Sequence, residues 1–180
     1  MDFVNMGKSG LKVSAVGLGC NNFGWSISPE ASKPVVHKAL DMGVTLFDTA
    51  DIYGDPPGKA ESVLGPLLKG KRDDIVLTTK FGYDFSGGPP NNSRGYILRA
   101  LEASLKRLGV DWVDIYMVHI GDPATPLEET MRTLDEIVSS GKARYIAVSN
   151  MEPWRVVEAN WVAKELGARG FICSQNEYSL

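Results

Sequence analysis

Val44-Thr45-Leu46-Phe47-Asp48-Thr49-Ala50-Asp51-Ile52-Tyr53-Gly54 is the stretch that decides the fold of this 180-residue chain. It begins with an apolar run of the kind that predicts a buried strand, and the run stops at the carboxylate of Asp48. Five residues later, Tyr53 lies in a segment rich in Gly, Pro and Asp, which predicts a loop. The stretch therefore predicts a strand that ends in a carboxylate and passes into a loop carrying a phenol.

The same order of strand and helix recurs about every 30 residues, which matches the size of a βαβ unit. A β-hairpin is expected at residues 3–13, before the first repeat. Strands are predicted at 15–19, 44–47, 74–80, 113–119, 144–148 and 170–175, and helices at 29–42, 59–69, 93–108, 126–140 and 153–166. A capping box, Thr125-Pro126-Leu127-Glu128, predicts the start of the fourth helix. Strict alternation of strands and helices predicts a parallel sheet covered by helices.

Two architectures accommodate six parallel strands: an open doubly wound sheet and a (β/α)8 barrel. The length favours the open sheet, because a barrel typically needs about 250 residues. The strand ends favour the barrel, because the C-terminal ends of barrel strands converge on one mouth, where polar residues indicate function. Each strand after the first stops at a polar side chain, namely Asp48, Lys80, His119, Ser149 with Asn150, and Gln175. A complete six-stranded α/β domain with a different role is a third interpretation that the sequence leaves open.

The polar strand ends offer the parts of a general acid. A phenol ordinarily ionises near pH ~10, and a neighbouring ammonium lowers that pKa by stabilising the phenolate. Lys80 is placed to do this for Tyr53, and Asp48 supplies the counter-charge that a partly buried ammonium requires. His119 either orients a bound carbonyl or joins the proton relay. Together these residues suit the reduction of a carbonyl, with a hydride that a cofactor must supply.

The motifs in this order resemble those of the aldo-keto reductase family over essentially the whole chain. Residues 6–14 resemble the family's N-terminal hairpin, which plugs the bottom of the barrel, and residues 47–54 resemble its Asp/Tyr signature. Residues 79–82 carry the lysine of the family and residues 114–119 its histidine. Residues 148–150 and 175–180 resemble the segments that bind the nicotinamide carboxamide. The resemblance implies a (β/α)8 TIM-type barrel truncated after the sixth strand, with an N-terminal β-hairpin, and residues 1–180 as one incomplete domain.

By this resemblance the chain is an NADP-dependent oxidoreductase that reduces an aldehyde or ketone to an alcohol. The catalytic residues would be Tyr53 as general acid, Lys80 and Asp48 as the groups that tune it, and His119 as the group that positions the carbonyl. Nicotinamide contacts would come from Ser149, Asn150 and Gln175, with Asp48 beside them. The implied cofactor is NADPH, with NADH left open, and no metal is implied.

The resemblance also implies that two further βα units carry the aromatic that stacks on the nicotinamide and the basic residues that bind the cofactor phosphates. A second hypothesis therefore stays open, a non-catalytic truncated family member or binding subunit without this cofactor clamp. A sheet that stops after six strands exposes backbone edges, and such edges invite pairing with another chain. We accordingly expect self-association through the exposed sheet edges.

The composition argues against several classes of binding partner. The net charge is -3 without a basic block, so neither nucleic acid nor an anionic membrane surface is expected as a partner. The two cysteines, Cys20 and Cys173, form no CxxC motif, which argues against a disulfide framework or a zinc site and favours the reducing cytoplasm. The first residues do not resemble a signal peptide, and no apolar run approaches the ~20 residues of a membrane span.

Three further patterns in the sequence are less informative about function. Gly17, Gly19 and Gly24 are spaced GxGxxxxG, which is not the dinucleotide fingerprint GxGxxG. Asp48 and Asp51 are too close in sequence to flank a glycosidic bond from both sides. In the loop after the first strand, Phe23 and Trp25 either line a substrate pocket or simply pack.

Overall fold

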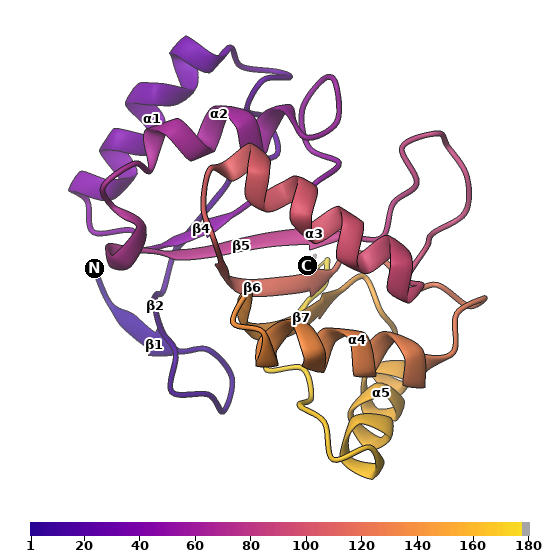
Figure 1. Cartoon of the computed structure of the whole chain (residues 1–180). Helices are drawn as coiled ribbons and strands as arrows, with labels where there is room; N and C mark the ends of the chain where they lie inside the picture. The colour runs from indigo at the N-terminus through magenta and orange to yellow at the C-terminus, as the bar shows by residue number, and fades with distance from the viewer. Residues whose placement is uncertain (178–180) are drawn as a thin grey trace.

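The computed structural model describes residues 1–177, which form a two-stranded hairpin, a six-stranded parallel sheet and five α-helices (Figure 1). The hairpin pairs β1 (Phe3–Asn5) with antiparallel β2 (Lys12–Ser14). The sheet strands are β3 (Gly17–Gly19), β4 (Leu46–Asp48), β5 (Val76–Phe81), β6 (Val113–Val118), β7 (Ala143–Ser149) and β8 (Ser174–Gln175). The helices are α1 (Pro29–Asp41), α2 (Lys59–Leu67), α3 (Arg94–Leu108), α4 (Leu127–Ser139) and α5 (Pro153–Glu165), and a short 3-10 helix, η1 (Arg72–Asp74), precedes β5.

The strand order identifies the architecture. The strands are hydrogen-bonded in chain order, β3-β4-β5-β6-β7-β8, and all neighbours are parallel. A doubly wound sheet reverses its strand order at a switch point and carries helices on both faces. Here the order does not reverse, and Figure 1 shows α1 to α5 following one another around one side of the curled sheet. The sheet is therefore a half-barrel, which confirms the truncated barrel prediction and rejects the open doubly wound sheet.

The two faces of the sheet pack against different partners, because side chains alternate along a strand. In β5, Leu77 and Phe81 point outward into the large apolar core between the sheet and the helices. Val76 points inward and belongs to a smaller apolar cluster on the concave face. By the same alternation, Thr78 and Lys80 also point inward. The strand is fully buried, as expected for a parallel strand with both faces covered.

The hairpin covers the start of the concave face. Met6, Leu11 and Val13 pack against the apolar cluster there. Ser14 Oγ accepts the backbone N–H groups of Thr45 at 3.0 Å and Leu46 at 3.3 Å, which fixes the hairpin at the N-terminal end of β4. Figure 1 shows the hairpin on the side of the sheet away from the helices. This confirms the expected plug at the barrel bottom and leaves the C-terminal strand ends accessible.

Helix starts follow the prediction in one case and depart from it in another. Ser28 caps α1 by accepting a backbone N–H of the first turn, as the Ser-Pro sequence indicates. The capping box predicted at residues 125–128 is wrong, because Pro126 occupies the N-cap of α4 and no side chain caps that helix. The Thr125 hydroxyl instead donates to Asp122 Oδ2 at 2.5 Å. The hydroxyl therefore serves the turn at Asp122, and Thr125 lies one residue before the N-cap position.

The sixth strand is shorter than the sequence predicts. Of the described residues, only Ser174 and Gln175 form the strand, in register with Val148 and Ser149 of β7, although the backbone N–H of Ile172 already donates to the carbonyl of Ile146 at 3.0 Å. Earlier in the segment, the backbone N–H of Phe171 donates to a side-chain oxygen of α5 at 2.8 Å. That bond ties residue 171 to the helix instead of the sheet, so the apolar run enters the strand late.

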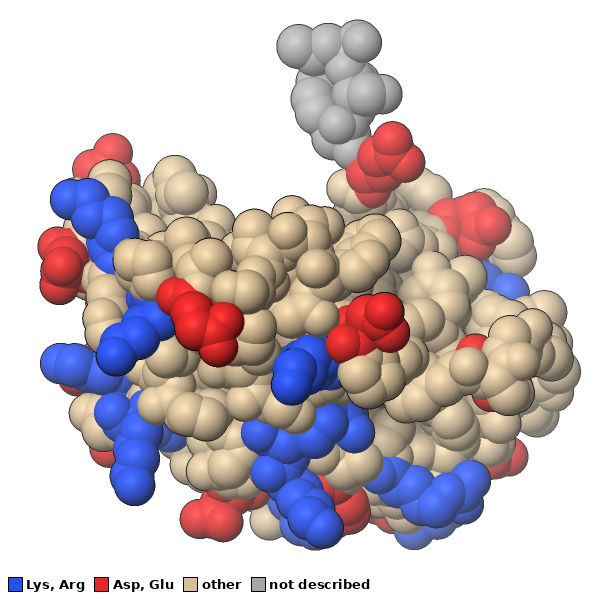
Figure 2. Space-filling view, turned by 90° about the horizontal axis from the view of Figure 1, so that it is seen from above, with Lys and Arg blue, Asp and Glu red and all other residues tan. Residues whose placement is uncertain are grey.

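The surface combines both signs of charge with one apolar stripe. Lys and Arg side chains gather toward the lower edge of the face shown in Figure 2, with acidic side chains among them, and the upper part is mostly uncharged. On α5, Trp154, Val157 and Trp161 are exposed at helical spacing. No helix within residues 1–177 is both long and apolar enough to cross a membrane.

Candidate functional site

The C-terminal ends of the strands bring the predicted polar residues onto the concave face. The sheet register staggers neighbouring strands: Asp48 pairs with Thr78, which lies two residues before Lys80. Lys80 in turn pairs with a residue that lies two before His119, and Ser149 pairs with Gln175. Because the period of a strand is two, all of these side chains point toward the interior of the half-barrel. Five polar groups from five strands therefore meet at one mouth, as the strand ends predicted.

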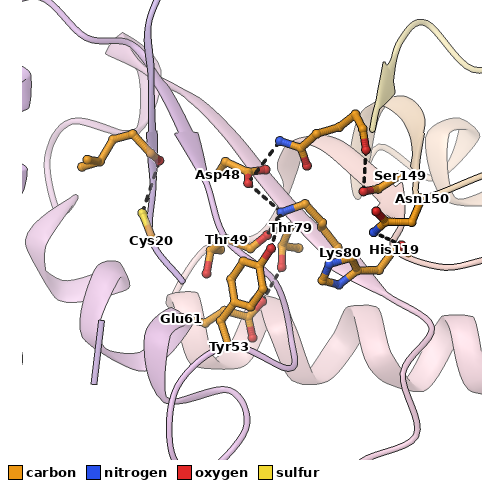
Figure 3. Close-up of polar contacts among 12 residues, drawn as sticks. Cys20, Asp48, Thr49, Tyr53, Glu61, Thr79, Lys80, His119, Ser149 and Asn150 are labelled. Carbon is orange, nitrogen blue, oxygen red and sulfur yellow. Dashed lines mark hydrogen bonds and ion pairs between the residues drawn. The ribbon is translucent and has the colours of Figure 1, made fainter. Parts of the chain in front are cut away.

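Lys80 is the centre of the site (Figure 3). Its side chain is fully buried, and its ammonium forms an ion pair with Asp48 Oδ2 at 2.6 Å. It also donates to the backbone oxygen of Thr49 at 3.0 Å and to the Tyr53 hydroxyl at 3.3 Å. Each of its three N–H groups thus has an oxygen partner, and one partner carries the compensating charge. The Asp48–Lys80–Tyr53 chain of contacts predicted from the sequence is present.

The loop that carries Tyr53 is fastened to the sheet and to α2. The backbone N–H of Asp51 donates to the carbonyl of Lys80 at 3.1 Å, which seats the loop on the end of β5. The Tyr53 N–H donates to Ala50 O at 3.2 Å, and the Tyr53 carbonyl accepts from Ala60 N at 3.1 Å at the start of α2. These bonds hold the phenol next to the buried ammonium.

His119 lies beside Tyr53 in a dry environment. The rings of Tyr53 and Tyr83 approach it edge-on, with centroids 5.5 Å and 4.9 Å from the imidazole. Burial lowers the pKa of His119 to about 4, and the positive charge of Lys80 acts in the same direction. The imidazole is therefore neutral near pH 7 and has one N–H to donate. Its Nδ1 is buried and has no hydrogen-bond partner within residues 1–177.

The three residues expected to contact a nicotinamide lie together next to this group. Ser149 donates its hydroxyl to the Gln175 carbonyl at 2.7 Å, and Asn150 Nδ2 donates to the His119 carbonyl at 3.0 Å. Gln175 Nε2 lies 3.4 Å from Asp48 Oδ2. Asn150 has a positive φ of 49°, a backbone conformation that side chains other than Asn and Asp rarely adopt. The segment 149–150 is thus turned toward the mouth rather than continuing directly into α5.

A cavity of about 340 Å³ occupies the concave face below these groups. It is lined by Met6, Leu46, Asp48, Thr78, Ile115, Met117, Cys173, Ser174, Gln175 and Asn176. A larger hollow of about 560 Å³ lies between the ends of α2 and α3. It is at the N-terminal end of the strands, where a barrel does not carry its chemistry. Asp48, the ion-pair partner of Lys80, lines the smaller cavity.

The two aromatic residues proposed for substrate binding have different surroundings. Phe23 is buried and belongs to the outer apolar core, so its ring packs. Trp25 is exposed. Of the two residues, Trp25 is the one available to a substrate, and contact with a substrate stays a prediction for both.

Several polar contacts behind the site were not anticipated from the sequence. Glu61 is fully buried on α2, accepts from the Thr79 hydroxyl at 2.5 Å and pairs with Arg107 Nε at 2.6 Å. Thr79 immediately precedes Lys80, so this network braces the lysine from the helix side (Figure 3). A carboxylate at the border of the apolar face of a helix was the available signal for Glu61. Tyr83 carried no comparable signal, because a loop tyrosine alone indicates no role.

A half-barrel whose strand ends hold a buried lysine between an aspartate and a tyrosine defines a class of (β/α)-barrel protein with ionisable groups gathered at its mouth. The chain belongs to the aldo/keto reductase family, whose model matches residues 15–180. It is 43% identical over 162 residues to the L-glyceraldehyde 3-phosphate reductase of Escherichia coli (strain K12), covering 86% of this chain and 47% of that relative.

A second relative extends the match to the whole chain. The versiconal hemiacetal acetate reductase of Aspergillus parasiticus is 37% identical over 208 aligned positions, which cover 100% of this chain and 60% of the relative. The chain therefore spans about half the length of one of these curated relatives and three fifths of the other. The family assignment inferred from the motifs is confirmed.

Proposed function

We propose that this chain carries the proton-transfer half of a nicotinamide-dependent carbonyl reductase, which converts an aldehyde or ketone to an alcohol. The observation that carries the proposal is the fully buried ammonium of Lys80, which contacts the carboxylate of Asp48 and the hydroxyl of Tyr53 at once. A buried lysine is costly unless it is paired. Its contact with the Tyr53 phenol at the mouth of the half-barrel supports a role for Lys80 in proton transfer.

Each side chain then has a defined role. Tyr53 would donate its hydroxyl proton to the carbonyl oxygen while the carbonyl carbon receives a hydride, so that the new O–H and C–H bonds replace the π bond of the carbonyl. Lys80 stabilises the phenolate that remains, and Asp48 holds Lys80 in place. His119, neutral near pH 7, donates a hydrogen bond that orients the carbonyl oxygen. A general acid in this position contributes about 10²–10⁴-fold to the rate.

The polar groups at the mouth fit a nicotinamide carboxamide. Within residues 1–177, Asn150 Oδ1 and Gln175 Oε1 accept no hydrogen bond, and the second N–H of each amide is also free to donate. A carboxamide needs both an acceptor and a donor, and these two residues offer them next to Asp48, with Ser149 fixing Gln175 through its carbonyl. A bound reduced nicotinamide supplies the hydride. We propose NADPH as the cofactor, with NADH as the alternative to compare.

The relatives favour an aldehyde as the substrate class. Glyceraldehyde 3-phosphate is an aldehyde, and a hemiacetal is the masked form of one. The rings of Tyr53 and His119 contact each other edge-on, with centroids 5.5 Å apart. A carbonyl must therefore lie against both rings from one side, and an aldehyde needs less room there than a ketone. We therefore propose a small aldehyde in preference to a bulky ketone.

The proposal is tested by reducing glyceraldehyde with NADPH and following the loss of reduced-nicotinamide absorbance. Tyr53→Phe removes the proton donor and should lower the rate by about 10²–10⁴-fold. Tyr145→Phe is the matched control, because Tyr145 packs beside the concave apolar cluster and makes no contact with Lys80; this variant should keep the wild-type rate. Equal rates for the Tyr53 variant and wild type would remove the phenol from the mechanism.

We also propose self-association of the chain through its sheet edges. In the described part of the sheet, β3 and β8 each have only one strand neighbour. An unpaired strand edge offers N–H and C=O groups to another chain. The exposed stripe of Trp154, Val157 and Trp161 on α5 adds apolar area on the helix that precedes β8. A second copy of the chain would pair with a free strand edge and cover the apolar stripe on α5.

A further inference from the structure

A group of charged residues lies directly behind the catalytic loop, on the helix side of the sheet. Glu61 on α2 and Arg107 on α3 form an ion pair at 2.6 Å, and Ser104 accepts a second hydrogen bond from the guanidinium at 3.1 Å. Asp51 belongs to the loop that carries Tyr53 and is almost completely buried beside this pair. Two carboxyl groups therefore share one region of low polarity with a single paired cation.

Asp51 has no partner for its charge. Both carboxyl oxygens are buried and without a hydrogen-bond partner within residues 1–177, and none of the ion pairs among those residues includes Asp51. A buried ionised carboxylate costs several kcal/mol unless it is paired, whereas the protonated acid avoids most of that cost. Arg107 is already committed to Glu61, so the ionised form of Asp51 is the one that this environment excludes.

We propose that Asp51 is a positioning residue for Tyr53, and that it performs this role as a neutral carboxylic acid. Its backbone N–H binds the carbonyl of Lys80, and its side chain is two residues from the phenol. Ionisation of Asp51 places a second negative charge beside Glu61. That repulsion, together with the need to hydrate the new charge, favours lifting the loop off β5 and moving the Tyr53 hydroxyl away from Lys80.

The surroundings of Asp51 agree with the neutral form. Burial, and after it the charge of Glu61, raises the pKa of Asp51 to about 8. The charge of Arg107, the nearby backbone N–H of Ile52 and the charge of Lys80 act in the opposite direction with smaller effect, although the Ile52 N–H does not reach hydrogen-bond geometry with the carboxyl. Neutral phenols of Tyr96 on α3 and Tyr116 on β6 also lie near it. A hollow of about 250 Å³ beside Asp51 is lined by Asp84, Phe85, Tyr96, Arg99, Ala100, Ala103 and Arg107, and it gives the proton a route to solvent.

The retained proton gives a measurable dependence of stability on pH. The unfolded chain loses the Asp51 proton near pH 4, whereas the folded chain keeps it to about pH 8. The unfolding equilibrium constant of the wild type should therefore rise with pH through this window, by about tenfold per unit for one proton. Between about pH 6.5 and pH 8 the expected rise is about 15-fold. Over this interval the unfolded chain loses the remaining proton of His119, which lowers the unfolding constant by about twofold. This change is the same in the wild type and in a variant of Asp51, so it cancels when the two are compared.

The first experiment compares urea unfolding of the wild type and Asp51→Asn across that interval. Asparagine has the shape of the neutral acid and no proton to lose, so the roughly 15-fold rise through Asp51 should vanish in the variant. Asp135→Asn is the control, because Asp135 pairs with Arg169 at the surface and should leave the wild-type dependence intact. If the ratio of the two unfolding constants, wild type to Asp51→Asn, is the same at every pH value, then Asp51 does not retain a proton in the folded chain.

A second variant acts in a different way and covers the case in which Asp51→Asn fails to fold. Glu61→Gln releases Arg107 to pair with Asp51, so Asp51 ionises at lower pH and the wild-type rise should again be lost. A wild-type pH dependence in Glu61→Gln contradicts the competition for Arg107 on which the inference rests.

The positioning role of Asp51 is tested by measuring amide hydrogen exchange in the loop peptide that covers residues 49–60. After correction for intrinsic exchange rates, the wild type should lose protection above about pH 8, and Asp51→Asn should retain it. Equal loss of protection in both proteins would show that Asp51 does not hold the loop. Only the consequence for catalysis rests on the proposed function of Tyr53; neither readout needs cofactor or turnover, so the two proposals fail separately.

Discussion

Replacing Asp48 with Asn should destabilise the chain strongly while changing its shape very little. The substitution keeps an oxygen next to Lys80, but it removes the one negative charge within residues 1–177 that pairs with the buried ammonium. The two remaining partners of the ammonium, Thr49 O and the Tyr53 hydroxyl, are neutral. An ammonium whose side chain is fully buried and whose partners are all neutral is poorly compensated.

The size of the effect follows from the burial of the pair. Removing one partner of a buried ion pair costs about 3–5 kcal/mol. The lysine side chain is 0% exposed and the aspartate side chain is 17% exposed, so water approaches the pair from one side only. We place the cost near the lower end, at about 3 kcal/mol. With an m-value of about 2 kcal/mol per molar urea, the midpoint of unfolding should fall by about 1.5 M.

The assay is equilibrium urea unfolding at neutral pH, followed by circular dichroism. Asp135→Asn is the matched control, because it removes the same charge from an exposed pair with Arg169, for which a cost of about 1 kcal/mol or less is expected. The reasoning predicts a clear difference between the two Asp→Asn variants. It is refuted if both variants unfold at the same urea concentration, because the buried pair would then contribute no more than a surface pair.

Three further outcomes follow from the structure. His119 should take up a proton only near pH 4 in an NMR titration; since the unfolded chain takes it up near pH 6.5, the free energy of unfolding should fall by up to about 3 kcal/mol as pH drops from 6.5 to 4. Gly65→Ala should cost about 1–3 kcal/mol, because the new Cβ would lie 2.9 Å from Leu108 Cα and closer still to its carbonyl. Sedimentation at micromolar concentration should show dimers or larger species, which Trp161→Glu should shift toward monomer.

Each of these outcomes has a result that would contradict it. For the NMR titration, an uptake midpoint of His119 near pH 6.5 contradicts its burial beside Lys80. Gly10→Ala, with no atom within 4 Å of the new Cβ, controls for the loss of glycine, and equal costs for the two glycine variants would remove the close approach of α2 and α3 as a cause. A wild-type chain that sediments only as a monomer argues against pairing through the sheet edges.

Much of the fold could be predicted from local patterns, because parallel strands with both faces buried read as short apolar runs. The regular spacing of these runs, each followed by an amphipathic helix, gave the order of elements. Length alone pointed to the wrong architecture, and the polar strand ends corrected it. Element limits were less predictable: the side chain of Asn160 binds the backbone of Phe171, and a contact between distant residues of this kind leaves no mark on local periodicity.

The site residues that lie at strand ends were predictable, because the C-terminal strand ends of a barrel converge. The geometric assembly of Asp48, Tyr53 and Lys80 follows directly from their positions at the ends of two neighbouring strands and in the loop after the first of them. The ion pair behind the site was not predictable, because Glu61 and Arg107 belong to separate helices and meet only when these helices pack. The lone carboxyl of Asp51 was likewise invisible in sequence, where it resembled an ordinary loop aspartate.

The measurement that tests the account most directly is binding of NADPH to the 180-residue chain, followed by nicotinamide fluorescence. The account predicts saturable binding at micromolar concentration, weakened in a variant that carries Asn150→Ala and Gln175→Ala. An absence of binding up to millimolar cofactor would contradict the central claim, because the buried Lys80 and its phenol would then face a mouth that holds no hydride donor.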